Sequence, residues 1–171
     1  NIGLNITEKR PDNYHNIESI FYPIPIKDIL EIVSSKSEQT QLHLTGIPID
    51  GDSQDNLIMK AYKLLATDFS IPAVDIYLDK IIPFGAGLGG GSSDAAFTLM
   101  GLNQLFNLGL STEQLEAYAS KLGADCPFFI RNQPTYATGI GTIFSPIQLS
   151  LKNIFMVLVK PNDYISTKEA Y

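Results

Sequence analysis

The chain has 171 residues and an ordinary globular composition, 44% hydrophobic and 18% charged, enough for one domain with a sizeable core. Its formal net charge of −6 argues against general nucleic-acid binding, which needs basic surface to meet backbone phosphates. The single cysteine, Cys126, excludes an intrachain disulfide and favours a reducing, cytoplasmic location, and no apolar run approaches the roughly 20 residues of a membrane span. We therefore expect neither nucleic acid nor a membrane as partner.

The first half of the chain predicts short strands and one helix. Asn13 lies in a charged turn and can take the left-handed conformation almost as glycine would. Residues 57–65 have the i, i+3, i+4, i+7 spacing of an amphipathic helix, which Asp55 or Asn56 can cap. Alternating or clustered apolar residues predict strands over 2–6, 17–24, 29–33, 41–44 and 74–78.

The second half predicts two helices and further strands. A helix is expected over 92–106, and a capping box, Ser111 with Gln114, begins another that ends at Gly123. Apolar strands are then expected after Asp125, near 135–138 and over 154–159. With no internal repeat and no linker, this order predicts a single α+β domain.

Residues 83–96 hold five of the thirteen glycines, between a predicted strand and a predicted helix, a context that is not typical of a flexible linker. Free N–H groups that lead into a helix N-terminus form a site for anions, above all phosphate. The pattern at Gly85, Gly87 and Gly90 matches a dinucleotide loop, but the acidic strand end about 20 residues on is missing. No lysine precedes Ser92, which excludes a Walker loop, and the glycine required by a nucleophile elbow is absent.

Four other polar positions leave two explanations each. Ser92 and Ser93 can cap the helix or contact a metal-bound phosphate. Asp125 precedes an apolar run, where a carboxylate can be partly desolvated, but a turn or capping role explains it as well. Tyr14, in a Tyr-His pair after a turn, is of a kind that more often serves packing than ligand binding. Separately, His43 lies within an apolar strand and is interpreted as structural.

The glycine-rich segment resembles the phosphate loop of the galactokinase, homoserine kinase, mevalonate kinase and phosphomevalonate kinase (GHMP) superfamily, in the pattern Pro83-x-x-x-Gly87-Leu88-Gly89-Gly90-Gly91-Ser92-Ser93-x-Ala95-Ala96. Three other segments narrow the resemblance to the family of 4-diphosphocytidyl-2-C-methyl-D-erythritol kinases. They are residues 10–17, 122–129 and 137–141, which are similar to its R-x-D-G-Y-H, L-G-A-D-V-P-F-F and A-x-G-x-G segments. These four matches occur in the family's order over nearly the whole chain.

The resemblance implies an α+β fold like domain 2 of ribosomal protein S5, with a left-handed βαβ unit. Residues 1–171 would be the N-terminal ATP-binding and catalytic domain of a kinase, as a fragment without the ferredoxin-like domain that normally follows. The face left by that missing domain would expose apolar surface and favour oligomers.

The implied activity is ATP- and Mg²⁺-dependent phosphorylation of the 2-hydroxyl of 4-diphosphocytidyl-2-C-methyl-D-erythritol, a transferase step of isoprenoid and terpenoid biosynthesis. Asp125 would be the catalytic base, and Tyr14 and His15 would hold the cytosine, with Asn1 and Tyr171 as further substrate contacts. The nucleotide would be bound by Asn56, Pro83, Gly85, Ala86, Gly87, Leu88, Gly89, Gly90, Gly91, Ser92 and Ser93, the two serines also lying near the metal.

Three departures qualify this interpretation. The family's lysine falls one or two positions before Asn1, so a chain that starts there would turn over poorly. Asn13 replaces the usual glycine, and Asp94 replaces the usual asparagine, where a carboxylate near phosphate repels unless it turns away, meets a cation or reaches Mg²⁺. A kinase for another small alcohol, or a nucleotide-binding module without turnover, are the alternatives.

Overall fold

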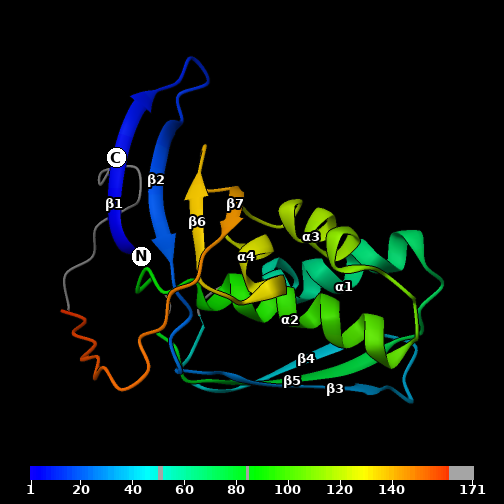
Figure 1. Ribbon diagram of the computed structural model, residues 1–171. Coiled ribbons are helices and arrows are strands. Elements are labelled where there is room, and N and C mark those ends of the chain that lie inside the picture. The colour runs from blue at the N-terminus through cyan, green and yellow to red at the C-terminus, as the bar shows by residue number, and fades with distance from the viewer. Residues whose placement is uncertain (50–51, 84, 162–171) are drawn as a thin grey trace. The chain divides into compact units, whose positions relative to one another are not determined.

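The computed structural model describes residues 1–49, 52–83 and 85–161 (Figure 1). The chain divides into two compact units, one formed by Asn1–Pro23 with the residues from Gln133 onward, the other by Ile24–Asn132. Strands and helices occur together, as the predicted α+β class requires. Among the described residues, no helix is both long and apolar enough to cross a bilayer.

The first unit contains an antiparallel sheet of four strands in the order β1-β2-β6-β7. Asn13 turns the chain between the first two strands at φ 66°, the left-handed conformation expected of it. The core side of the sheet carries buried Ile17, Phe21 and Ala137. The strands are β1 (Ile2–Lys9), β2 (His15–Phe21), β6 (Thr135–Thr138) and β7 (Ile143–Pro146).

The second unit places helices on one side of a three-stranded sheet, in the order β3-β5-β4 (Figure 1). Strand β5 pairs antiparallel with β3 and parallel with β4, and α1 forms the crossover between the parallel strands. The elements are β3 (Ile29–Ser34), β4 (Gln41–Gly46), the 3₁₀ helix η1 (Ser53–Asp55), α1 (Leu57–Asp68), β5 (Val74–Lys80), α2 (Gly90–Leu105), α3 (Thr112–Ser120) and α4 (Cys126–Arg131).

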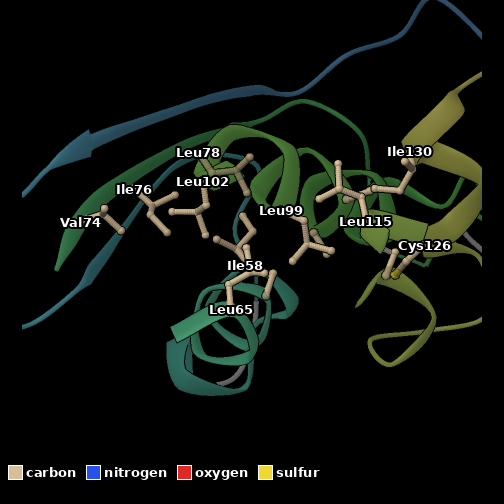
Figure 2. Close-up of a cluster of buried hydrophobic side chains, with 14 residues drawn as sticks. Ile58, Leu65, Val74, Ile76, Leu78, Leu99, Leu102, Leu115, Cys126 and Ile130 are labelled. Carbon is tan, nitrogen blue, oxygen red and sulfur yellow. The ribbon is translucent and has the colours of Figure 1, made fainter. Parts of the chain in front are cut away.

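One hydrophobic core joins the sheet of the second unit to its helices. Every second residue of β5 is buried, which is the period that a strand covered on one face requires. The labelled side chains of Figure 2 form a continuous row from Val74 and Ile76 to Cys126 and Ile130. The helix that follows Asp125 is therefore anchored in the same core as the helix that follows the glycine loop.

Two predicted strands are wrong. Residues 126–131 form α4, with Pro127 in its first turn and left-handed Asn132 ending it at φ 48°. A short apolar run fits a buried helix as well as a buried strand, and here tertiary packing decided. Residues 154–159 form no regular element and are exposed, because no described strand pairs with them. Strand β7 and the helix η1 were not predicted.

Candidate phosphate-binding and catalytic site

The glycine loop leaves β5 and enters α2, as its flanking patterns predicted. Gly85, Gly87 and Gly89 have φ of 67°, 68° and 67°, a backbone conformation that residues with a Cβ atom rarely adopt. Helix α2 starts at Gly90, with left-handed Gly89 as its N-cap. The first N–H groups of a helix have no acceptor inside it, so this turn offers donors for an anion.

Ser92 and Ser93 lie inside the first turn of α2, so capping does not explain them. The N-cap position belongs to Gly89, and the Ser93 N–H donates to the Gly89 carbonyl at 2.8 Å. Burial raises the pKa of the Cys126 thiol, while a hydrogen bond with the Ser92 side chain opposes that rise. The start of α2 therefore contacts the start of α4.

Asp125 is the N-cap residue of α4, but its side chain makes no capping hydrogen bond. The capping explanation is therefore wrong for Asp125, whereas the alternative of a turn residue is confirmed, because it lies in the turn that precedes α4. The residue is open to solvent at its surface, yet enough protein surrounds the carboxyl that burial raises its pKa above the ordinary value.

Helix α4, which begins directly after Asp125, packs against the end of the glycine loop. A Cβ atom on Gly89 would lie 2.8 Å from the Phe129 ring, so that ring packs directly on the N-cap of α2. Cys126, the residue after Asp125, in turn contacts Ser92 in the first turn of α2. Loop amides, serine hydroxyls and a carboxylate thus gather in one region of the second unit.

Asp94 is buried and meets a cation, which is one of the three ways in which its charge could be accommodated. Its Oδ2 accepts a hydrogen bond from Lys80 Nζ at 2.9 Å, and the same ammonium bonds to Asp28. Burial raises the pKa of Asp94 to about 6, although Lys80 opposes the rise. Neither Lys80 nor Asp28 was predicted as a site residue, but the alternation of β5 places residue 80 on its buried face.

Ala86, Leu88 and Gly91 are half-buried within the glycine-rich segment, and Asn56 and Pro83 are two further nucleotide-site candidates of the second unit. The Asn56 side chain caps α1, with its Oδ1 accepting from the Ile58 N–H at 2.9 Å. Capping is thus confirmed, and a contact with adenine stays a prediction. Pro83 is half-buried at the start of the loop.

The acceptor-site candidates belong to the first unit. Tyr14 is 61% exposed, and a turn held by Arg10 and Asp12 presents it, since Asp12 accepts from the Arg10 guanidinium and from the Tyr14 N–H. His15 begins β2 opposite Lys9, and Asn1 is exposed ahead of β1. Tyr171 lies outside the described residues.

The hydroxyls of Ser92 and Ser93 are the candidate metal ligands at the loop. No group of three His, Cys, Asp or Glu side chains within the described residues is arranged to hold a metal ion. Kinases commonly hold Mg²⁺ through substrate phosphates, water and one or two protein oxygens, so the hydroxyls of Ser92 and Ser93 fit such an ion. Asp94 is engaged by Lys80 and points to a different role.

The comparisons with known proteins agree with this arrangement. Residues 56–133 match the model of the GHMP kinases N terminal domain, a segment that contains the glycine loop, both serines and Asp125. The matched domain is the one that the glycine-rich segment resembles in sequence.

Individual relatives are similar over more of the chain than this domain model. Over its whole length the chain is 58% identical to the 4-diphosphocytidyl-2-C-methyl-D-erythritol kinase of Bacteroides fragilis and 46% identical to that of Porphyromonas gingivalis, and it spans 63% of each. A crystal structure of 4-(cytidine 5'-diphospho)-2C-methyl-D-erythritol kinase matches with TM-score 0.73 and 36% identity, over 86% of this chain and 52% of that one. A putative sugar kinase from Campylobacter jejuni, at 14% identity, TM-score 0.58 and coverage of 82% and 50%, shares the fold alone.

Proposed function

We propose that the chain is the catalytic part of an ATP-dependent kinase that phosphorylates the 2-hydroxyl of 4-diphosphocytidyl-2-C-methyl-D-erythritol. The observation that carries this proposal is the 58% identity over the whole chain to a kinase of that name, combined with Asp125 on the helix that packs against the glycine loop. The chain spans less than two thirds of such relatives, so we propose further that it is their N-terminal domain, of the ribosomal protein S5 domain 2 type, with β4–α1–β5 as its left-handed βαβ unit. A cytoplasmic location stays a prediction.

In this proposal the loop amides and first-turn N–H groups of α2 bind the ATP phosphates. Phosphoryl transfer depends mostly on positioning and on neutralising charge, which fixed N–H donors provide. The hydroxyls of Ser92 and Ser93 would help to hold Mg²⁺, which would supply further positive charge at the phosphates.

Asp125 acts as the base in the proposed reaction. Its carboxylate accepts the proton of the substrate hydroxyl as that oxygen bonds to the γ-phosphorus and ADP leaves. The raised pKa makes the ionised carboxylate a stronger proton acceptor than an ordinary aspartate, and it moves the acidic limb of turnover to higher pH.

The cytidyl group is assigned to Tyr14 and His15, with Asn1 and Tyr171 as further contacts. An exposed aromatic face suits stacking on a pyrimidine, and an imidazole can both donate to and accept from its edge.

The test is phosphoryl transfer from ATP to the cytidyl alcohol, measured on a chain extended at both ends to the length of its relatives. We expect Asp125→Asn to lower kcat by at least about a hundredfold while the Kd for ATP stays within a factor of about two. Asp75→Asn, the same change at a half-buried position of β5, is the matched control and should leave kcat unchanged.

Two results would contradict the proposal. Unchanged turnover in Asp125→Asn would remove the assignment of the base. Equal transfer to alcohols without a cytidyl group, with no loss in Tyr14→Ala, would favour a kinase for another small alcohol.

A further inference from the structure

Three ionisable side chains that the proposed mechanism does not use are buried together beneath the glycine loop. The side chains of Lys80, Asp28 and Asp94 are 3%, 4% and 8% exposed. Lys80 ends β5, Asp28 lies just before β3, and Asp94 lies in α2, so the cluster joins segments separated by 52 and 14 residues in sequence. We call these three residues the buried triad.

Asp28 holds the entry to the loop. Its Oδ1 accepts hydrogen bonds from the N–H groups of Ile81 and Ile82 at 2.6 and 2.7 Å, and its Oδ2 accepts from Lys80. These two amides belong to the residues that leave β5 just before Pro83. One carboxylate therefore fixes the direction in which the chain enters the loop.

Lys80 lies under the exit from the loop. A Cβ atom on Gly90 would come within 2.9 Å of Lys80 Nζ, so the ammonium contacts the first residue of α2. The same ammonium bonds to Asp94 one turn further along that helix. A cation at a helix N-terminus is unfavourable on its own, and the two carboxylates compensate it.

Burying three charges is not an efficient way to gain stability, because apolar side chains of similar volume often stabilise as well or better. Directional bonds do what apolar packing does not, since they hold their partners at fixed distances and angles. We propose that Lys80, through Asp28 and Asp94, is a positioning residue that sets the spacing between the two ends of the glycine loop, so that its amides converge on the nucleotide phosphates. This inference rests on the proposed nucleotide-binding function.

The experiment compares Lys80→Met, Asp94→Leu and Asp94→Asn in the full chain. The first two remove the bridge, so we expect the Kd for ATP to rise by roughly tenfold or more, because small misplacements of binding groups are costly. Asn can still accept from Lys80, so Asp94→Asn should remain within about threefold of the parent. Lys63→Met, at an exposed position of α1, is the matched control and should bind ATP as the parent does.

A merely structural role predicts a different pattern. Lower stability alone would reduce ATP and cytidyl affinity together, whereas a positioning role raises the Kd and KM for ATP and leaves the KM for the cytidyl alcohol unchanged. If Lys80→Met does not fold, Asp94→Leu retains the Asp28–Lys80 pair and gives the same comparison. ATP affinity within twofold of the parent in a folded bridge-removing variant would overturn the inference.

The proposed function and this inference fail in distinguishable ways. A parent that binds no ATP would contradict the proposed function, and hydrogen exchange then decides the inference. Faster amide exchange over residues 85–91 in Lys80→Met than in the parent would support the positioning role. Equal exchange in the two proteins would overturn it.

Discussion

Asn56 has a demonstrated structural role as a helix cap and a predicted functional role as an adenine contact. The two roles use different atoms of its side chain. Its Oδ1 caps α1, and Asp caps as well as Asn does. We expect Asn56→Ala to lower the free energy of unfolding by about 1 kcal/mol, and Asn56→Asp to leave it nearly unchanged. Denaturant unfolding and ATP titration of both variants check this.

The same pair of variants tests the predicted adenine contact. If the Asn56 NH₂ group donates to the nucleotide, Asn56→Asp will weaken ATP binding without loss of stability. Unchanged ATP affinity in Asn56→Asp would show that the residue is a cap and nothing more.

Asp94 should give the protein a distinctive stability profile between about pH 4 and pH 6. Desolvation raises its pKa from 3.8 to about 6 in the folded state, so the folded protein binds more protons than the unfolded chain in this interval. Its contribution is therefore fully present below the unfolded pKa and is lost as pH rises through about 6, a change on the order of 3 kcal/mol.

The measurement is the difference in unfolding free energy between Asp94→Asn and the parent, followed from pH 4 to pH 7. We expect this difference to move in favour of the variant as pH rises. Asp28 works in the opposite direction: burial raises its pKa, but the hydrogen bonds from Ile82, Lys80 and Ile81 and the charge of Lys80 together outweigh burial and lower the pKa. A difference that does not change with pH would mean that Asp94 titrates as an ordinary carboxyl.

At the scale of elements, the contact between α4 and the start of α2 decides where Asp125 lies. Gly89→Ala adds a Cβ atom 2.8 Å from the Phe129 ring at a φ of 67°, whereas Gly87→Ala has the same backbone strain and open space around it. We expect Gly87→Ala to cost about 1 kcal/mol and Gly89→Ala measurably more.

A double-mutant cycle with Phe129→Leu isolates the contact. Removing the ring should relieve part of the penalty of Gly89→Ala, with a coupling of roughly 0.5 kcal/mol or more by thermal or denaturant unfolding. Additive effects of the two substitutions would show that α4 does not press on the loop.

At the scale of the whole molecule, residues 154–159 form a continuous run of exposed apolar side chains within the part of the chain that the structure describes. Phe155 and Val157 are 99% and 87% exposed, and their neighbours in this segment are also exposed. Such surface favours association, so we expect the 171-residue chain to self-associate as its concentration rises. Sedimentation should show less association for a Phe155→Lys, Val157→Lys variant.

The control for that prediction adds the same charge without removing apolar surface. Gln148→Lys with Ser150→Lys changes two exposed polar residues nearby. Equal loss of association in both double variants would attribute the effect to net charge, and a monomeric parent would contradict the prediction.

Local physics explains what could be predicted from the sequence. The capping box of Ser111 and Gln114, the cap at Asn56 and the left-handed turn at Asn13 each depend on a few neighbouring residues, and all three are confirmed. The glycine loop is a local feature of the same kind, because its backbone conformation depends on the glycines themselves. By contrast, the apolar runs after Asp125 and at 154–159 carry no period long enough to choose between helix, strand and irregular chain.

By itself, the sequence determined that this protein carries a glycine-rich loop between a strand and a helix and resembles one kinase family, because glycine spacing and motif order are written in the chain. Only the tertiary structure decided that Asp125 begins a helix packed on that loop, and that Asp94 is held by Lys80 beneath it. These facts depend on partners such as Asp28, 52 residues from Lys80, which no local pattern brings together. The reason is that burial, and with it the role of a charge, is a property of packing between distant segments.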